Sequence, residues 1–272
     1  MTRVEAFLED VAEWARGEPG VRAALLVGSQ ARADSPADDW SDVDVVLFVD
    51  DPGRLAGDGG WLASFGSPEL TFVEPTPVAG ILERRVLFAD GLEADFALFP
   101  AAALPALSPD AEIASVVARG YRLLHDELDL ETALSAVGRA ADERRREPGE
   151  LVHDFWYHAL WTAKKLRRGE AVTARDCLEG RLKPLLVELG REHALRRDPA
   201  ADTWHRDRFV ERWADPRVVA AVWRATASSP DALAGALWEL CDDFDSLAAD
   251  VMAPDPGAAA ARGRLAGLLP PA

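Results

Sequence analysis

Cysteine is scarce in this chain of 272 residues, which contains only Cys177 and Cys241. The two lie far apart, and neither belongs to a Cys-x-x-Cys pair or stands beside a cluster of histidines. This scarcity argues against a disulfide framework and against a structural zinc site, both of which need several suitably spaced ligands. It also fits a reducing compartment, so we expect a cytoplasmic protein.

Long apolar runs are lacking as well. Although 49% of the residues are hydrophobic, no uninterrupted apolar run approaches the length of about 18 residues typical of a membrane span. Residues 1–20 mix acidic with apolar side chains, which argues against a secretory signal. The length of the chain allows one large domain or two of ordinary size, each with its own core.

Basic residues are outnumbered, with 30 Lys and Arg against 47 Asp and Glu, for a formal net charge of −17. Such a surface repels phosphate backbones, so we expect no nucleic-acid partner. It would attract a cationic partner. Many soluble proteins are acidic for solubility alone, however, and composition does not choose between these two interpretations.

The first half of the chain has the pattern of a helix followed by a sheet. Apolar residues recur with helical spacing over 4–14, and strands are predicted at 23–27, 43–49 and 70–75. The stretch RRVLFADGLEADFALFP at 84–100 predicts two further strands joined by a tight turn at Asp90-Gly91. We therefore expect an α/β (α+β) head with a mixed β-sheet over residues 1–140.

From about residue 110 the pattern is helical, without a convincing strand. Helices are predicted near 151–168, 171–190, 207–225 and 230–251, after a charged segment at 142–150 that is either a connection or a solvated helix end. The tail from 254 begins with turn-forming residues and is low in complexity, so we expect it outside the core. An all-helical C-terminal domain over residues 141–272 is the expectation.

The stretch VGSQARADSPADDWSDVDVVLFV at 27–49 carries the chemistry. Asp42 and Asp44 are two residues apart in a predicted strand, so their side chains share one face about 7 Å apart. Near an apolar sheet such a pair needs a cation, and Mg²⁺ prefers oxygen ligands and often joins carboxylates to substrate phosphates. Gly28 permits close backbone approach, and the Ser29 hydroxyl can hold a phosphate oxygen. The stretch therefore predicts nucleotidyl transfer.

This run, hydrophobic-Gly-Ser followed by a spacer and Asp-x-Asp, resembles the signature of the nucleotidyltransferase superfamily. WLASFG at 61–66, VLFADGLEADFALF at 86–99 and DFWYHALWTAKKLRRGE at 154–170 occur in an order similar to that in the aminoglycoside 6-adenylyltransferase (streptomycin adenylyltransferase) family. The resemblance covers roughly residues 1–190. It implies a Mg²⁺-dependent enzyme that transfers AMP from ATP to a hydroxyl of a streptomycin-like aminoglycoside, with a helical substrate-binding domain. It leaves open whether the chain is a monomer or a homodimer.

The resemblance also implies roles for residues in the sheet. Asp95 falls where the superfamily has its third strand carboxylate, so Asp42, Asp44 and Asp95 are the expected metal ligands and catalytic residues, in an arrangement similar to the two-metal sites of polymerases. Asp95 is also a candidate base for the acceptor hydroxyl. Glu93 shares its strand face and is a weaker candidate, for substrate binding. Without the resemblance, the less favoured alternative for Asp95 is an exposed strand residue after a turn.

Three residues of the predicted helix at 151–168 receive roles in the same way. Lys164 matches the family's lysine and is expected to hold the ATP triphosphate, although several basic residues beside it are also typical of a solvated helix end. Asp154 is a candidate contact for the cationic substrate or a base, with a helix N-terminal cap as the alternative. Trp156 is a candidate for a sugar or base pocket, with core packing as its alternative.

One departure concerns the phosphate turn, where related sequences often have arginine and this chain has Gln30. Either this change weakens binding of the triphosphate, or Arg32, two positions later, replaces the arginine. The spacer that follows contains Asp34, Asp38 and Asp39, which are either an acidic entrance for a polycation or a solvated loop.

Two other functions stay open. The same fold permits transfer to a protein side chain or to another small-molecule hydroxyl. A non-catalytic nucleotide-binding relative is the second alternative, against which the three intact aspartates count.

Overall fold

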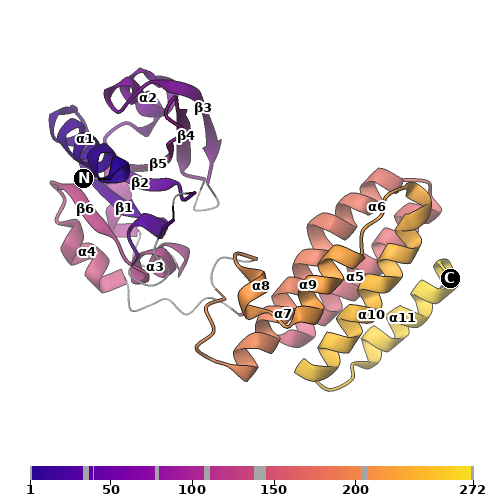
Figure 1. The fold of residues 1–272 in the computed structure, drawn as a ribbon. Coiled ribbons are helices and arrows are strands. Elements are labelled where there is room, and N and C mark those ends of the chain that lie inside the picture. The colour runs from indigo at the N-terminus through magenta and orange to yellow at the C-terminus, as the bar shows by residue number, and fades with distance from the viewer. Residues whose placement is uncertain are drawn as a thin grey trace. The chain divides into compact units, whose positions relative to one another are not determined.

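A computed structural model of the protein describes residues 2–32, 37–38, 40–76, 80–106, 111–137, 145–203 and 207–270. The chain divides into two compact units, Met1–Arg144 and Arg145–Ala272, shown in Figure 1. We call them the first unit and the second unit and describe each by itself.

The first unit is built on a six-stranded sheet with the order β3-β4-β5-β2-β1-β6. The pair β2 and β5 is parallel, and the other neighbouring strands are antiparallel. The expected mixed sheet is therefore confirmed. Its strands are β1 (Val21–Val27), β2 (Val43–Val49), β3 (Pro68–Pro75), β4 (Leu82–Phe88), β5 (Glu93–Pro100) and β6 (Arg122–Asp126).

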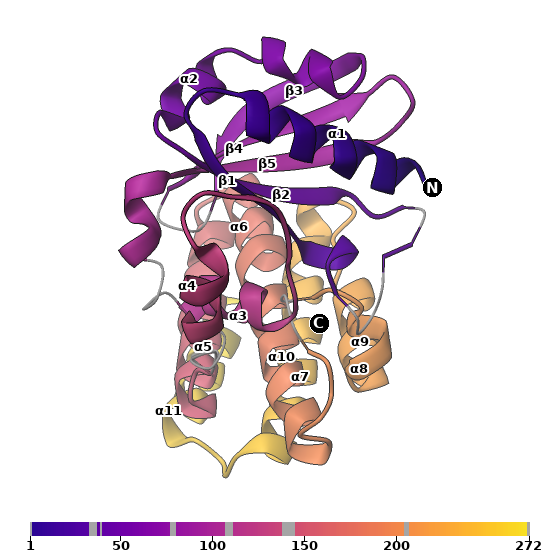
Figure 2. The ribbon, with the colours of Figure 1, turned by 90° about the vertical axis from the view of Figure 1, so that its left-hand side faces the viewer.

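Helices cover both faces of this sheet, and Figure 2 shows α1 on the opposite side of β1 and β2 from α3 and α4. On β2, Val43, Val45 and Leu47 point to the face that packs against α1 and α2. Phe48 belongs to the other face, with apolar side chains of α3 and α4. Because side chains alternate along a strand, Asp44 shares the face of Phe48. The helices of this unit are α1 (Arg3–Gly17), α2 (Pro52–Gly57), α3 (Ala111–Ala118) and α4 (Leu130–Val137), with short 3-10 helices η1 (Gly28–Gln30), η2 (Gly60–Ser64) and η3 (Ala101–Ala106).

Strand β6 corrects the expectation that no strand follows residue 110. It pairs antiparallel with β1 at one edge of the sheet. Its sequence, RLLHD, has no β-branched or aromatic residue, so local propensity gave no strand signal. Pairing with the buried strand β1 decides its structure.

The second unit is helical, as expected. The helices α5, α7, α9, α10 and α11 surround one apolar cluster, and near its centre the rings of Phe155 and Phe244 stack with their centroids 3.7 Å apart. None of the helices in the described ranges is long and apolar enough to cross a membrane. The elements are α5 (Pro148–Arg167), α6 (Ala171–Cys177), the π-helix η4 (Leu178–Leu182), α7 (Lys183–Arg197), α8 (Val210–Trp213), α9 (Pro216–Arg224), η5 (Pro230–Ala232), α10 (Leu233–Val251) and α11 (Pro256–Leu268).

Helix α11 corrects the second expectation, that the tail lies outside the core. Asp255 caps this helix by accepting a hydrogen bond from the Ala258 amide, and Leu265 is fully buried in the apolar cluster. The run of alanines that suggested low complexity is also the composition with the highest helix propensity. The Asp255 cap and the burial of one face of the helix are enough to hold α11 against α5.

Candidate functional site

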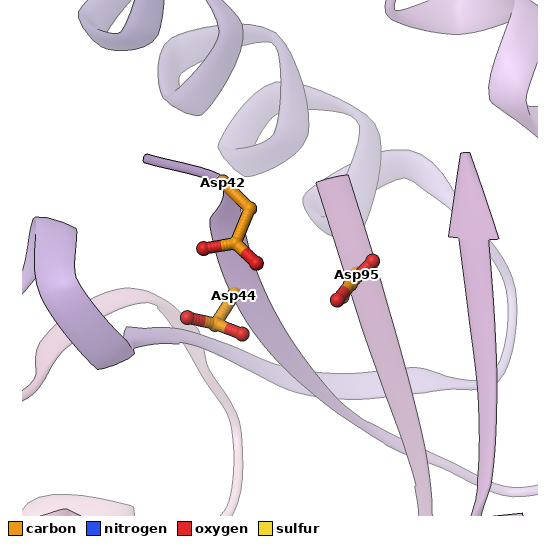
Figure 3. A group of neighbouring side chains, drawn as sticks. All are labelled: Asp42, Asp44 and Asp95. Carbon is orange, nitrogen blue, oxygen red and sulfur yellow. The ribbon is translucent and has the colours of Figure 1, made fainter. Parts of the chain in front are cut away.

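The carboxylates of Asp42, Asp44 and Asp95 meet on one face of the sheet, as Figure 3 shows. Asp44 and Asp95 are direct neighbours in the register of the parallel pair β2 and β5, and Asp42 immediately precedes β2. One carboxylate oxygen from each residue lies within 4.8 Å of the others. Two strands distant in sequence thus concentrate negative charge at a single point.

Burial makes Asp95 the most perturbed member of this group. Its side chain is 11% exposed, and burial raises its pKa to about 7, with the nearby carboxylates of Glu83, Asp42 and Glu93 adding to the effect and Arg85 opposing it. A carboxyl group with a pKa close to neutrality is suited to accept a proton under ordinary conditions. Burial supplies most of that property.

Arg85 is the residue beside this site that the sequence analysis missed. It lies on β4 opposite Asp95, and its Nη1 is 3.3 Å from Asp95 Oδ2. Its Nε is also 2.9 Å from Glu83 Oε1 and 2.7 Å from Glu74 Oε1. A register signal was present, because Arg85 and Asp95 are equally far in sequence from Asp90 in the predicted turn.

The Gly28 backbone fits closely against the aspartate pair. Gly28 has φ +69°, and a Cβ built on it would lie 1.9 Å from Asp44 Oδ2. Only glycine tolerates both the left-handed backbone and this approach. Ser29, the next residue, is 3% exposed, and its hydroxyl has no hydrogen-bond partner among the described residues.

We expect Gly28→Ala to destabilise the protein by roughly 2 kcal/mol or more, because the new methyl group collides with Asp44 as well as straining the backbone. Gly169→Ala is the matched control, since Gly169 has φ +77° but no atom within 4 Å of a built Cβ. It should cost only about 1 kcal/mol. Urea unfolding of the two variants measures the difference, and equal losses would contradict the close contact with Asp44.

These groups fit a divalent metal and a phosphate. The donor set offered by the three aspartates consists only of oxygen, which suits a hard cation such as Mg²⁺. The buried Ser29 hydroxyl lies at the end of β1, next to Gly28 and to the Asp44 carboxylate that packs on Gly28, where it would be a donor for a phosphate oxygen. The local geometry is therefore that of a cation site, formed by the three aspartates, beside a candidate phosphate site at Gly28 and Ser29. We call Gly28 and Ser29 the phosphate cradle.

The other sequence candidates in this unit lie near the cradle or at the sheet. Glu93 is exposed at the start of β5, on the face of Asp95. Gln30 ends the short helix η1, and Arg32 is 8% exposed. Of the acidic spacer, Asp38 is exposed and accepts a hydrogen bond from Ser41 Oγ at 2.9 Å, whereas residues 34 and 39 lie outside the described residues. Phosphate binding by Arg32 stays a prediction.

Asp154 lies in the second unit and already has strong partners. Its Oδ2 accepts hydrogen bonds from Arg146 at 2.8 Å and Arg181 at 2.6 Å, and His158 Nδ1 is 2.7 Å from its Oδ1. Burial acts to raise its pKa, but the two arginines outweigh this and hold the pKa below its usual value. The alternative of a helix cap is wrong, because α5 begins at Pro148. A cationic substrate would compete with two guanidinium groups for Asp154, and contact between this residue and a substrate stays a prediction.

Trp156 and Lys164 lie on the same helix, α5, with opposite exposure. Trp156 is 2% exposed in the apolar cluster, and its indole donates a hydrogen bond to Asp245 Oδ1 at 3.3 Å. This is the packing role left open by the sequence, and contact between Trp156 and a substrate stays a prediction. Lys164 is exposed, and its role with the triphosphate stays a prediction.

Comparison with known proteins identifies the family. Residues 1–254 match the family model described as streptomycin adenylyltransferase. This chain belongs to the streptomycin adenylyltransferase family. The resemblance expected from the Gly-Ser and Asp-x-Asp motifs is thereby confirmed.

Individual relatives in the streptomycin adenylyltransferase family are distant in sequence. The chain is 24% identical over 190 residues to an aminoglycoside 6-adenylyltransferase of Bacillus subtilis, covering 65% of this chain and 64% of that protein. It is 30% identical over 96 residues to one of Campylobacter jejuni, covering 33% of each. A crystal structure of an aminoglycoside 6-adenyltransferase from Bacillus subtilis is similar with a TM-score of 0.42 and 13% identity, over 98% of both chains. The alignments thus span less than two thirds of the length of the two sequence relatives.

Proposed function

We propose that this protein transfers AMP from ATP to a hydroxyl group of a streptomycin-like aminoglycoside, in a reaction that depends on Mg²⁺. The observation that carries the proposal is the meeting of Asp42, Asp44 and Asp95 beside the Gly28-Ser29 cradle. Membership of the streptomycin adenylyltransferase family supports it, as does the similarity to two aminoglycoside 6-adenylyltransferases.

The first step is binding of the nucleotide. In this proposal Asp42, Asp44 and Asp95 hold Mg²⁺, which would neutralise charge on the triphosphate as the reaction proceeds. Ser29 donates its hydroxyl hydrogen to a phosphate oxygen, and the missing side chain of Gly28 lets the metal-binding carboxylate of Asp44 lie directly against this turn. The family's lysine, Lys164, is the proposed further contact to the triphosphate.

The second step is transfer. The acceptor hydroxyl oxygen attacks the α-phosphorus, the bond from that phosphorus to the β-phosphate bridging oxygen breaks, and pyrophosphate leaves in line with the attack. Asp95, whose carboxylate lies at the proposed metal site, accepts the proton of the acceptor hydroxyl. The products are pyrophosphate and an adenylylated acceptor.

The charge of the protein favours a cationic acceptor. With a net charge of −17 the surface attracts guanidinium and ammonium groups, although salt screens this attraction beyond about 8 Å. Recognition at closer range therefore depends on side chains near the attacked phosphorus.

Mass spectrometry of reactions with ATP, Mg²⁺ and a panel of aminoglycosides tests the proposal. We expect streptomycin or a close relative to gain the mass of one AMP group, with pyrophosphate released in equal amount. AMP attached to a protein, with every aminoglycoside unchanged, would replace the proposed acceptor. The absence of any pyrophosphate release would reject the enzymatic proposal itself.

Ser29→Ala separates nucleotide binding from folding. Removing a buried hydroxyl that has no partner among the described residues should leave the melting temperature unchanged or raise it. Losing a donor to a charged phosphate should raise the KM for ATP about tenfold or more. Ser64→Ala, at an exposed serine of the same unit, is the control and should change neither quantity. An unchanged KM for ATP in Ser29→Ala would remove Ser29 from the site.

A further inference from the structure

Four side chains form one row across the neighbouring strands β2, β5, β4 and β3. The register pairs Asp44 on β2 with Asp95 on β5, Asp95 with Arg85 on β4, and Arg85 with Phe72 on β3. Directly paired residues point to the same face of a sheet. Phe72 therefore lies on the face of the carboxylates, two strands beyond Asp95 and about 10 Å from it.

The position of the proposed phosphate cradle, Gly28 and Ser29, indicates on which side of Asp44 the acceptor binds. Gly28 and Ser29 follow β1, on one side of β2, whereas Asp95 lies on β5, on the other side of β2. In-line transfer requires the attacking oxygen and the departing pyrophosphate to lie on opposite sides of the α-phosphorus. A triphosphate held by the cradle therefore places the acceptor over β5, β4 and β3.

The surface on that side is both apolar and acidic. Phe72 is 55% exposed and Leu70, its neighbour on the same face of β3, is 66% exposed. Beside them, the guanidinium of Arg85 is shared by the carboxylates of Asp95, Glu83 and Glu74, so the acids outnumber the base. An exposed aromatic ring next to surplus negative charge suits a cation that also carries an apolar ring face.

We propose that Phe72 is a specificity-determining residue that contacts the acceptor, and that a guanidinium- or ammonium-bearing ring packs on its exposed aromatic face beside Glu74. This inference rests on the proposed function and refines it by assigning the acceptor to strands β3 and β4. The distance of about 10 Å from Asp95 means that the ring on Phe72 is a different one from the ring that bears the attacking hydroxyl. The acceptor therefore has at least two rings.

The test compares Phe72→Ala, Phe72→Tyr and the wild-type protein. For Phe72→Ala we expect the KM for the aminoglycoside to rise about tenfold. The KM for ATP should stay within about twofold of the wild-type value, and the melting temperature should change by no more than about one degree. Calorimetric titration of the same aminoglycoside, without nucleotide, should show the matching loss of affinity. Phe72→Tyr keeps the aromatic face and should behave as wild type.

Glu74→Gln supplies an independent second variant. It removes one partly exposed charge beside Phe72 and should raise the KM for the aminoglycoside severalfold, more at low salt than at high salt. Trp223→Ala, at an exposed aromatic residue of α9, is the control and should leave the acceptor KM unchanged.

The outcomes are distinguishable. If the wild-type protein adenylylates no aminoglycoside, the proposed function fails and this inference fails with it. If it does so and the acceptor KM is unchanged in Phe72→Ala, the inference alone is overturned. A change of oligomeric state in Phe72→Ala, measured by light scattering and accompanied by an unchanged acceptor KM, would instead assign the exposed edge strand β3 to contact between copies of the chain.

Discussion

Asp44→Asn is expected to reduce the rate of AMP transfer about a thousandfold or more. The carboxylate of Asp44 is the central one of the site, because it lies beside Asp95 in the sheet register and against Gly28. A neutral amide is a poor ligand for a hard divalent cation, and loss of the charge stabilisation that such an ion supplies amounts to several powers of ten in rate. Steady-state AMP transfer measures the effect.

A control on the same strand shows whether position or charge matters. Asp50 follows the other end of β2, where it forms an ion pair with Arg22 at 2.6 Å. Asp50→Asn should transfer AMP at nearly the wild-type rate, since an exposed ion pair contributes little to stability. If Asp44→Asn kept more than about a tenth of the wild-type rate, the assignment of the metal site would be wrong.

Asp95→Asn is expected to have opposite effects on activity and on stability. Loss of the proposed base and metal ligand should lower kcat by about a hundredfold to ten-thousandfold. In the absence of metal, however, the same variant should be more stable than wild type at pH 8. The reason is that burial of the carboxyl raises its pKa to about 7 from the value of 3.8 that applies to the unfolded chain.

The direction of the pH dependence follows from these two values. As pH rises from 3.8 towards 7, the unfolded chain releases the Asp95 proton while the folded protein keeps it, so folding loses stability. Above about pH 7 the loss is complete and constant. The advantage of Asp95→Asn in melting temperature should therefore grow up to about pH 7 and then level off.

Adding Mg²⁺ and ATP should reverse the order of stability. A divalent cation favours the ionised carboxylates and binds only the folded protein, so it should stabilise wild type more than Asp95→Asn. Thermal melts of both proteins at several pH values, with and without Mg²⁺ and ATP, test this. A variant that is less stable than wild type at pH 8 without metal would show that the carboxyl group of Asp95 is not strained by its burial.

The parts of the fold that could be predicted have local signals. The strands that carry Asp44 and Asp95 are apolar runs with clear ends, and the turn at Asp90-Gly91 is a strong hairpin pattern. Strand β6 has neither property, since RLLHD becomes a strand only by pairing with β1. In the same way, α11 is fixed by the burial of Leu265 against helices distant in sequence.

The same distinction applies to the site. Asp42 and Asp44 are predictable because alternation along one strand places them together. Arg85 follows from the register of the hairpin at Asp90-Gly91, whereas Phe72 depends on the pairing of β3 with β4, for which the motifs give no signal. Asp154 shows the converse limit, because a sequence does not reveal that Arg146 and Arg181 already bind a carboxylate. The site features that the sequence did not predict are those that depend on contacts between residues distant in sequence.

Binding of Mn²⁺ together with a non-hydrolysable ATP analogue is the most direct test of the carboxylate site. In the wild-type protein, electron paramagnetic resonance should detect protein-bound Mn²⁺ when the analogue is present, and without the analogue only when Mn²⁺ is in excess. The signal of protein-bound Mn²⁺ should be lost when Asp42 and Asp44 are both replaced by asparagine. Circular dichroism would confirm that the double variant is folded. A double variant that binds Mn²⁺ and the analogue as tightly as wild type would contradict the central claim that these aspartates form the metal site for nucleotidyl transfer.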